Sequence, residues 1–572
     1  MKCFCQLKFV LGLILYFSCI NALSAQNDSD LVNSYKDYIE APREIVYAHL
    51  NKSTYIKGES IGFTAYVLDK KDRSLSLPTT NLYVTITNSD DKVIKQKLIK
   101  VEDGIAANSF VIDSLFSSGT YHFKAYTNWM RNFNEHNYYS ESIKIIDPKT
   151  EAYIENSIVE NSIDAQFLPE SGHLLHGVEN TVGVVIKDSQ GFGIPNANGE
   201  VLDKDNQTLT SFKTNQFGIA KFPLIAESNS NYRVAIDYAN KKDIFPLGQT
   251  VEKTGIILSV KRLKTKLYVS VVTNDTTLDA IKNKRFTLMV HNGNAYDILD
   301  IYFTDSTVVT KVIDYNSIPA GINILTLFND IDMPVAERLF FNYEGIDIVT
   351  SNTISTEKTY DSLSIDLGYR NINPQSFNSI SISVLPEATT SYNRHNNIAS
   401  HIYLQPYIKG PIEFGQYYFQ NIDEKKRYEL DNLLLTQGWS SYDWSTMFLP
   451  ENLPYAFEQG LFLKANINNQ KFTEDTYVLH HFGNSQPIYK KATDGNTSFI
   501  FENVFPTEND RVLISRFKNE KEMVPAQLYI QSTPNTIPNI KLSSKPLPPK
   551  SQYTIAENLN TVPFYEDNTY NL

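Results

Sequence analysis

Apolar and polar side chains alternate along much of this chain with a period of two. In residues 82–86 the apolar Leu82, Val84 and Ile86 are separated by single residues, and residues 121–125 repeat this arrangement. Successive side chains of a β-strand point to opposite faces, so the alternation predicts strands with one buried face and one face in solvent. A large part of the chain is therefore predicted to form half-buried strands.

A repeat of about 110 residues groups these strands into units. The tripeptide Gly-Ile-Ala occurs at 104–106 and again at 218–220, each time upstream of a predicted strand that begins with a tyrosine, at Tyr121 and Tyr232. Residues 320–325 carry a third version of the turn and strand. A sandwich of seven or eight strands needs about 100 residues, so the period predicts a tandem array of β-sandwiches.

Two segments depart from the period of two. Residues 28–40 are polar and are predicted to be helical. Residues 423–438 place four leucines among charged residues, and Asp423 can cap the first turn, so we expect one short amphipathic helix there. The two tryptophans that follow, Trp439 and Trp444, are expected to hold this helix against a sandwich.

Residues that interrupt strands, such as Asp147-Pro148, indicate the boundaries between units. The predicted fold class is all-β, a tandem array of immunoglobulin-like β-sandwiches with one short amphipathic helix. The predicted boundaries are a signal peptide at 1–25, a lead-in segment at 26–40, β-sandwiches at 41–147, 148–250, 251–345 and 346–455 (the last with the helix 423–438), a final β-sandwich at 456–540, and a flexible tail at 541–572.

The composition supports strands and argues against a nucleic-acid partner. The 572 residues include 35 Tyr and 32 Phe, whose rings pack well on a pleated surface. Lys and Arg number 52 against 64 Asp and Glu, a formal charge of −12. Because no block of basic residues is present to follow a phosphate backbone, we expect no nucleic-acid partner.

The first 25 residues resemble a secretory leader. Lys2 and Lys8 precede an apolar run at 9–17, and small residues at 23–25 predict cleavage before Gln26. The run is too short for a transmembrane helix, which needs about 20 residues. We therefore expect an exported protein of the periplasm or outer membrane, with no transmembrane segment of its own.

The cysteines Cys3, Cys5 and Cys19 all lie in this leader. A mature chain without them has no disulfide, thiolate metal site or cysteine nucleophile. An alternative is that Ser18-Cys19 is a lipoprotein cleavage site, which would make Cys19 a lipid-bearing N-terminus.

Residues 58–62, Gly-Glu-Ser-Ile-Gly, match the nucleophile-elbow pattern of serine hydrolases. That elbow requires a helix after the serine. Residues 63–68 instead predict a strand, so we expect a loop that enters an edge strand.

Two histidine pairs are the candidate metal ligands. His173 and His176 share a short loop, but no third and fourth ligand follow from the spacing, and His480 and His481 point to opposite faces of a strand. No phosphate loop or calcium loop has the required spacing. We therefore predict no catalytic, cofactor-binding or metal-binding residue and no cofactor.

Two stretches of the first sandwich resemble a known family. Residues 44–66, with Tyr-Ile-Lys-Gly-Glu at 55–59, and residues 118–130, which begin Ser-Gly-Thr-Tyr, are similar to the second macroglobulin-type domain of the alpha-2-macroglobulin superfamily in exported bacterial proteins. Residues 166–172, 433–439 and 442–444 resemble the continuation of those proteins, which often end in a carboxypeptidase-regulatory-like sandwich and a TonB-dependent receptor plug. The resemblance implies macroglobulin-type sandwiches and a regulatory-like sandwich at 456–540.

This resemblance implies a non-catalytic binding or scaffolding rod whose partner is an outer-membrane TonB-dependent receptor. An alternative is a non-covalent endopeptidase inhibitor without a thioester, which would bind proteases. Its bait, a partner loop between two ordered patterns, is predicted at Thr389 to Ile408, with Thr389, Arg394, His401 and Tyr407 as candidate contact residues. A carbohydrate-active enzyme with paired carboxylates is a further alternative, although no motif identifies the pair.

Overall fold

The computed structural model describes residues 30–149, 162–447, 452–468, 475–483, 485–492, 497–518 and 522–550. The predicted signal peptide, with its three cysteines, lies outside these residues. Among the described helices, none is long and apolar enough to cross a membrane. The chain divides into two compact units, Met1–Pro42 with Asp443–Asn452, and Arg43–Tyr442 with Leu453–Leu572.

The described part of the smaller unit consists of two helices, α2 (Asp30–Glu40) and α6 (Trp444–Met447). The ring of Tyr35 in α2 stacks on Trp444, with 6.1 Å between centroids. The helix predicted at 28–40 is confirmed over its described residues. Trp444 packs in this unit and Trp439 is 38% exposed, so the prediction that both hold the 423–438 helix is wrong.

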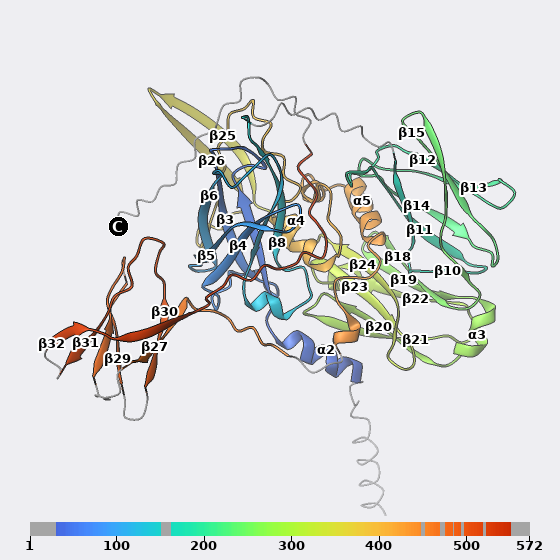
Figure 1. Cartoon of the computed structure of the whole chain (residues 1–572). Helices are drawn as coiled ribbons and strands as arrows, with labels where there is room; N and C mark the ends of the chain where they lie inside the picture. The colour runs from blue at the N-terminus through green and yellow to red at the C-terminus, as the bar shows by residue number, and fades with distance from the viewer. Residues whose placement is uncertain are drawn as a thin grey trace, which may run out of the picture. The chain divides into compact units, whose positions relative to one another are not determined.

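The first sandwich of the larger unit consists of two sheets (Figure 1). Their strand orders are β1-β3-β6 and β2-β8-β7-β4-β5. The strands are β1 (Glu44–Leu50), β2 (Thr54–Ile56), β3 (Ser60–Asp69), β4 (Asn81–Asn88), β5 (Val93–Lys100), β6 (Ile105–Val111), β7 (Gly119–Tyr126) and β8 (Tyr139–Ile146). Leu82, Val84, Ile86 and Phe123 lie in one core. The residues between them, such as Thr85 and Lys124, are also buried, so the prediction that these two strands have one face in solvent is wrong. Later parts of the chain cover that face, since Lys124 donates to the carbonyl of Ile540. Ser60 begins β3, so the Gly-Glu-Ser-Ile-Gly stretch enters a strand, as predicted. That strand pairs with both β1 and β6, so the prediction of an edge strand is wrong.

The second sandwich repeats this architecture. Its sheets have the orders β14-β11-β9 and β13-β12-β15-β16, and β10 pairs with β17. The strands are β9 (Asp164–Pro169), β10 (Leu174–Leu175), β11 (Glu179–Lys187), β12 (Asn198–Leu202), β13 (Thr208–Lys213), β14 (Ile219–Ile225), β15 (Arg233–Tyr238), β16 (Lys241–Pro246) and β17 (Val251–Glu252).

The Gly-Ile-Ala repeat has a steric reason in this sandwich. Gly218, directly before β14, has a φ of +70°, and a Cβ there would lie 2.1 Å from the carbonyl oxygen of Ile186. Gly104 precedes β6 in the same way, with a φ of +77° and Leu75 Cβ 2.7 Å from the added carbon. Both turns need a residue that has no side chain and tolerates positive φ.

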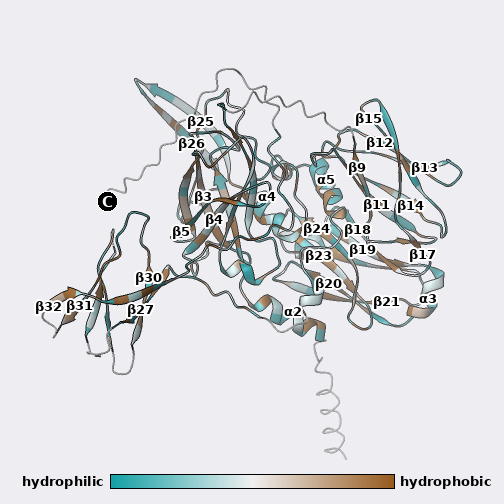
Figure 2. Ribbon diagram, in the orientation of Figure 1, coloured by the Kyte–Doolittle hydropathy of each residue, from teal (hydrophilic) through white to brown (hydrophobic). Residues whose placement is uncertain are grey.

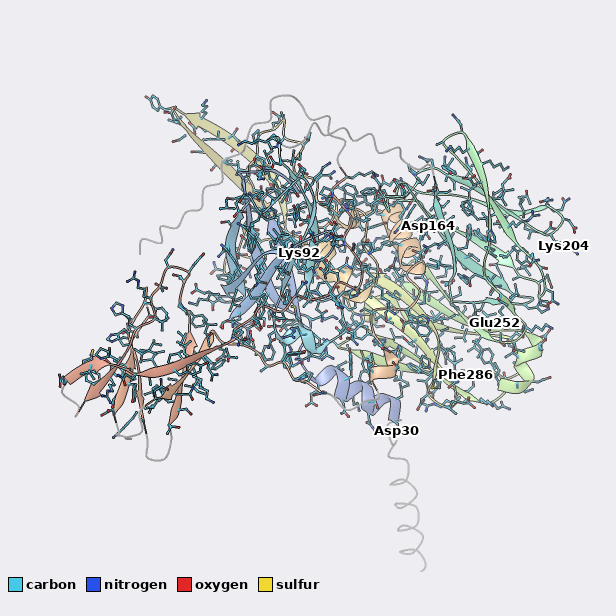
Figure 3. All side chains as sticks on the ribbon, viewed as in Figure 1. Asp30, Lys92, Asp164, Lys204, Glu252 and Phe286 are labelled. Carbon is cyan, nitrogen blue, oxygen red and sulfur yellow. The ribbon has the colours of Figure 1, made fainter. Side chains whose placement is uncertain are left out.

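The third sandwich has the sheets β18-β19-β22 and β21-β20-β23-β24. Its elements are β18 (Ile256–Leu263), β19 (Lys266–Thr273), α3 (Asp275–Ile281), β20 (Arg285–His291), β21 (Tyr296–Tyr302), β22 (Val308–Asp314), the 3-10 helix η2 (Tyr315–Ser317), β23 (Gly321–Phe328) and β24 (Pro334–Asn342). Phe286, labelled in Figure 3, belongs to its core.

The last sandwich has the sheets β30-β27-β33 and β29-β28-β31-β32. Its strands are β27 (Leu461–Ile467), β28 (Thr476–Leu479), β29 (Ile488–Lys491), β30 (Ser498–Val504), β31 (Ile514–Lys518), β32 (Glu522–Pro525) and β33 (Leu528–Thr533). Figure 2 shows hydrophobic and hydrophilic residues mixed along the strands of the sandwiches. The described chain is thus mostly β, in tandem sandwiches, which confirms the predicted fold class.

Residues 346–455 differ from the fourth sandwich predicted there. Their described part contains one two-stranded sheet and short helices. These elements are β25 (Thr350–Thr359), β26 (Ser362–Arg370), α4 (Ile398–Tyr403), the 3-10 helices η3 (Gln405–Tyr407) and η4 (Gly415–Phe419), α5 (Glu424–Leu435) and α6. Period two continues at 379–384 after β26, but those residues form no strand, and the described elements from 398 onward are helices. The amphipathic helix is confirmed as α5, capped by the Asp423 side chain.

Later parts of the chain return to the first sandwich. Phe457 stacks on Trp129 with 4.1 Å between ring centroids. Ile537 and Ile540 pack against the core, and the buried Lys124 donates to the carbonyl of Ile540. The described residues 541–550 of the predicted flexible tail continue along this sandwich, and residues 551–572 lie outside the described part.

Candidate functional site

The segment between β26 and α4 leaves apolar side chains in solvent. Residues 371–397 form no helix or strand. Phe377 is 70% exposed and Ile382 is 59% exposed, with Ile380 and Val384 similarly accessible. Exposed apolar residues gathered in one place indicate an interaction surface. We refer to residues 371–392 as the exposed segment.

The serines of the exposed segment fasten it to β1 and to the turn that follows this strand. His49 Nδ1 lies 2.8 Å from Ser381 Oγ, and its Nε2 lies 3.0 Å from the Tyr392 hydroxyl. Ser383 Oγ donates to the carbonyl of Asn51 at 2.5 Å. Because serine and apolar residues alternate here, the serines face the sandwich while the isoleucines face solvent.

Two backbone hydrogen bonds extend this attachment. The amides of Ser53 and Thr54 donate to the carbonyl of Ser391 at 2.8 and 3.1 Å.

Burial, followed by the positive charge of Arg394, lowers the pKa of His49 to about 4. His49 is therefore neutral at pH 7, and one of its ring nitrogens accepts while the other donates.

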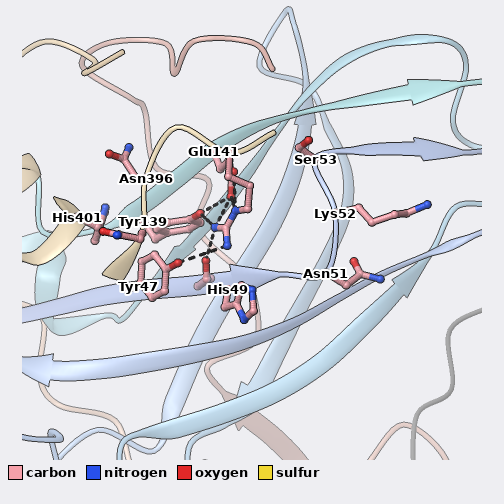
Figure 4. A network of polar contacts seen from close by, with 12 residues as sticks. Tyr47, His49, Asn51, Lys52, Ser53, Tyr139, Glu141, Asn396 and His401 are labelled. Carbon is pink, nitrogen blue, oxygen red and sulfur yellow. Dashed lines mark hydrogen bonds and ion pairs between the residues drawn. The ribbon is translucent and has the colours of Figure 1, made fainter. Parts of the chain in front are cut away.

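Arg394 anchors the chain just downstream of the exposed segment, where it contacts Tyr47, Tyr139 and Glu141, which Figure 4 labels. Its side chain is 3% exposed, and its Nη2 lies 2.7 Å from Glu141 Oε2 on β8. Its Nε donates to Glu141 Oε1 at 2.9 Å, and Nη2 donates to the Ala48 carbonyl at 2.8 Å. The hydroxyls of Tyr47 and Tyr139 accept from the same guanidinium. The planar fork of arginine suits such a two-pronged contact with a carboxylate.

This network is buried yet charged. Burial opposes the charge of Arg394, but Glu141 and the two tyrosines outweigh it and raise the pKa of Arg394. Burial also raises the pKa of Tyr47 to about 12, so its hydroxyl stays protonated. A buried ion pair of this kind contributes little net stability, but removal of one partner is costly because a buried charge is left uncompensated.

His401 and Tyr407 hold the chain after Arg394. His401 Nε2 lies 2.8 Å from the Val46 carbonyl, and burial lowers its pKa to about 4, so the neutral ring donates this bond. The Tyr407 ring is buried, and Lys70 Nζ lies 4.8 Å from its centroid. Lys70 is itself paired with Glu135.

The structure therefore places the predicted bait residues in two environments. Thr389 is half-buried, and its hydroxyl lies 2.9 Å from that of Ser391. Arg394, His401 and Tyr407 are buried, and Arg394 and His401 share the network around Tyr47 and Tyr139. A protease could reach them only after local unfolding, because substrates must be extended and accessible. The accessible chain lies upstream, in the exposed segment. In the sequence, the alternation Ser-Ile-Ser-Ile-Ser-Val at 379–384 is the feature that could have identified this segment.

His176 and His480, one from each histidine pair, contact other side chains. His176 Nδ1 lies 3.2 Å from Glu227 Oε2, and His480 Nε2 lies 2.9 Å from Ser515 Oγ. Within the described ranges, no group of three histidine, cysteine, aspartate or glutamate residues is arranged to hold a metal ion.

No protein-family model matches the chain, and no curated protein matches it. Solved structures with similar architecture include several bacterial alpha-2-macroglobulins. The native conformation of the Escherichia coli protein is 11% identical over 57% of this chain and 24% of that chain, with a TM-score of 0.16. The Escherichia coli protein activated by porcine elastase is also 11% identical, over 57% and 33%, with a TM-score of 0.20.

Dimeric latent PorU from Porphyromonas gingivalis is 10% identical over 52% of this chain and 33% of that chain, with a TM-score of 0.23. This chain thus spans only a quarter to a third of the lengths of these three structures. At such identities and TM-scores the likeness carries no inference about activity.

Proposed function

We propose that this protein is a non-catalytic, exported binding protein built from macroglobulin-type sandwiches, and that it engages a protease non-covalently through the exposed segment. The observation that carries this proposal is the combination of a strandless apolar run in solvent with a buried anchor at its downstream end. Exposed loops of this kind are preferred sites of proteolytic cleavage. Binding residues also lie preferentially on loops that a rigid scaffold positions.

The geometry gives cleavage a defined consequence. After a cut in the exposed segment, the Arg394 anchor keeps the downstream end on β1 and β8, whereas the upstream end stays attached to β26. The covalent link between the two parts is lost, but the apolar side chains remain available to the protease. Residues 20–572 contain no cysteine, so the mechanism does not include a thioester.

The sequence of the exposed segment also selects the class of protease. Residues 371–392 contain no Lys or Arg, but they contain Phe377, Val384, Leu385 and Tyr392. Proteases with apolar or small specificity pockets, of the chymotrypsin or elastase type, fit these residues. A trypsin-type pocket, which holds a basic side chain, has no suitable residue within the segment.

Binding to chymotrypsin whose catalytic serine is replaced by alanine tests the proposal. We expect the two proteins to elute together in size-exclusion chromatography. A variant with Ile380→Ser, Ile382→Ser and Val384→Ser should lose this co-elution. Separate elution of the wild-type chain and the inactive protease would remove the protease-binding proposal.

The sheet of β25 and β26 favours a second candidate, scaffolding at an outer-membrane TonB-dependent receptor. Leu363, Ile365 and Ile354 lie on one face of this sheet, all exposed, and both outer edges of the two strands are unpaired within the described chain. Such an edge can accept an extended strand from a partner. Crosslinking in cells followed by mass spectrometry distinguishes the two, since crosslinks from Lys358 in β25 to a receptor favour scaffolding.

A further inference from the structure

A cavity of about 490 Å³ lies where α5 covers the second and third sandwiches. Its walls come from β11 and β14 of the second sandwich, β18 and β24 of the third, and α5. Contacts join α5 to both β14 and β24, as the ribbon also shows (Figure 1). Its volume falls within the range of about 300–1,000 Å³ that is typical of ligand sites.

The acidic groups at the base of this cavity are already neutralised. Arg338, 1% exposed, places Nε 2.9 Å from Glu170 Oε1 and Nη2 2.6 Å from Asp431 Oδ1. Lys221 Nζ lies 3.2 Å from Asp431 Oδ2. Burial raises the pKa of Asp431, but Arg338 and Lys221 outweigh burial and lower it overall. These carboxylates therefore need no bound cation to balance their charge.

Two other arginines of the cavity keep unused hydrogen-bond donors. Within the described chain, Arg262 Nε and Arg427 Nη1 are buried and have no hydrogen-bond partner. Both guanidiniums are held in place by aromatic rings, since Arg262 lies 5.0 Å from the Tyr315 centroid and Arg427 lies 4.8 Å from that of Tyr343. Arginines that are oriented in advance lose little entropy when they bind an anion.

The carboxylates that pair with these two arginines are exposed. One is Glu344, whose Oε1 lies 3.5 Å from Arg427 Nη2 and whose side chain is 53% exposed. Glu424, the first residue of α5, lies 3.2 Å from Arg262 Nη1 and 3.8 Å from Arg427 Nε, and its side chain is 80% exposed. Exposed ion pairs contribute little, so another carboxylate can replace Glu424 at low cost. Glu424 thus marks the position at which a carboxylate from a ligand would lie.

The cavity also lies along a sheet edge. β18 is the outer strand of its sheet, and Ser259–Arg262 line the cavity. The amides of Leu258 and Val260 point away from β19, because they donate to Ser171 and Glu170. By the period of two, the Arg262 amide points to the same side of β18. Because Ser171 and Glu170 already occupy the edge at Leu258 and Val260, a peptide whose carboxylate reaches the two arginines can accept one further hydrogen bond, from the Arg262 amide.

We propose that this cavity binds a carboxylate-bearing peptide, with Arg262 and Arg427 as its carboxylate receptors and the Arg262 amide as a further hydrogen-bond donor. The carboxylate is a chain terminus or an Asp or Glu side chain. Charged hydrogen bonds to a carboxylate suit two guanidiniums that aromatic rings orient and that have only exposed carboxylates as ion-pair partners. This site is independent of the exposed segment and of the proposed protease engagement.

Fluorescence anisotropy with a defined peptide set tests the proposal on the full chain. The probes are pentapeptides labelled at the N-terminus with nitrobenzoxadiazole, a dye without a carboxylate. Their last residue is each of the twenty amino acids, and each is made as a free acid and as an amide. The amides that end in Asp or Glu retain a side-chain carboxylate. We expect saturable binding only of peptides that carry a carboxylate. No saturable binding by any probe, or equal binding of a free acid and its carboxylate-free amide, would overturn the proposal.

Matched variants are expected to change the binding affinity in opposite directions, which a folding defect would not do. Arg262→Gln and Arg427→Gln should each weaken binding at least about tenfold, because each loses charged hydrogen bonds. Glu424→Gln should strengthen binding by about two- to fivefold, since it removes the internal competitor. Arg285→Gln, an exposed arginine paired with Asp300 in the same sandwich, should change nothing. Unchanged affinity in both arginine variants, or weaker binding by Glu424→Gln, would contradict the assignment.

Discussion

Arg394 and Glu141 are 253 positions apart in the sequence and form a buried ion pair, with 2.7 Å between Nη2 and Oε2. This pair connects the segment that follows β26 to strand β8 of the first sandwich. Because the chain between β26 and Arg394 is exposed and strandless, the pair fixes one end of an otherwise accessible segment. The proposed function depends on this arrangement.

Replacement of Arg394 tests the anchor. Arg394→Met should destabilise the first sandwich by about 3–5 kcal/mol, because Glu141 is left buried and unpaired. The double variant Arg394→Met with Glu141→Gln removes both charges and should recover much of that loss. Hydrogen exchange at the amides of β1 and β8 measures both effects. Equal protection in the wild type and Arg394→Met would contradict an anchoring role.

The stability of this region should depend on pH. Burial lowers the pKa of His401 to about 4 from its ordinary value of 6.5, so the unfolded chain binds more protons than the folded chain between these values. The contribution is therefore fully present above pH 6.5 and is lost as the pH falls toward 4, by roughly 3 kcal/mol in total. His401→Gln can keep the bond to the Val46 carbonyl without titrating. Urea unfolding between pH 7 and 4.5 should show a smaller loss for His401→Gln than for the wild type, and parallel curves would refute this.

The glycine of the repeat gives a prediction for the second sandwich. Gly218→Ala should cost at least about 2 kcal/mol more than Gly248→Ala, since overpacking adds about 1–3 kcal/mol. Both positions have positive φ. The added Cβ would lie 2.1 Å from Ile186 O at Gly218, whereas at Gly248 it would lie 4.0 Å from Pro246 O. Thermal unfolding compares the two. A Gly218→Ala protein as stable as Gly248→Ala would show that the close approach is not required.

The apolar side chains of the exposed segment should contribute to binding and not to stability. Ile380→Ser, Ile382→Ser and Val384→Ser together should weaken binding to the inactive chymotrypsin at least about tenfold, through lost apolar burial. Surface substitutions of this kind usually change stability by no more than about 0.5 kcal/mol each. Ile331→Ser, at another exposed isoleucine, is the control and should leave binding unchanged. Surface plasmon resonance would reveal an equal loss in the control if the effect were nonspecific.

The sequence was sufficient for features that depend on local periodicity. The alternation at 82–86 predicted a strand, and the spacing of leucines after Asp423 predicted α5. Both predictions were possible because the periodicity of a strand or helix depends on residues that are close in the sequence. The sequence predicted a fourth sandwich at 346–455, but the described part of this region has a single two-stranded sheet. The alternation along β26 predicts a strand and does not reveal that a second sheet is missing.

The candidate site depended on distant contacts. The burial of Arg394 requires Glu141 and Tyr47 from strands of the first sandwich, and no local pattern predicts a partner at such a separation. The arginines Arg262 and Arg427 likewise meet only when β18 and α5 come together. In contrast, the serine and isoleucine alternation at 379–384 was visible in the sequence, but only the structure shows that it has no partner strand.

Limited digestion with active chymotrypsin tests the central claim most directly. The mature chain is mixed with the protease, the first cut is mapped by mass spectrometry, and the remaining activity is measured on casein and on a small chromogenic peptide. We predict a first cut within residues 371–392 and a stoichiometric fall in casein hydrolysis, with little change for the small peptide. A first cut elsewhere, or full casein hydrolysis after a cut in this segment, would contradict the account.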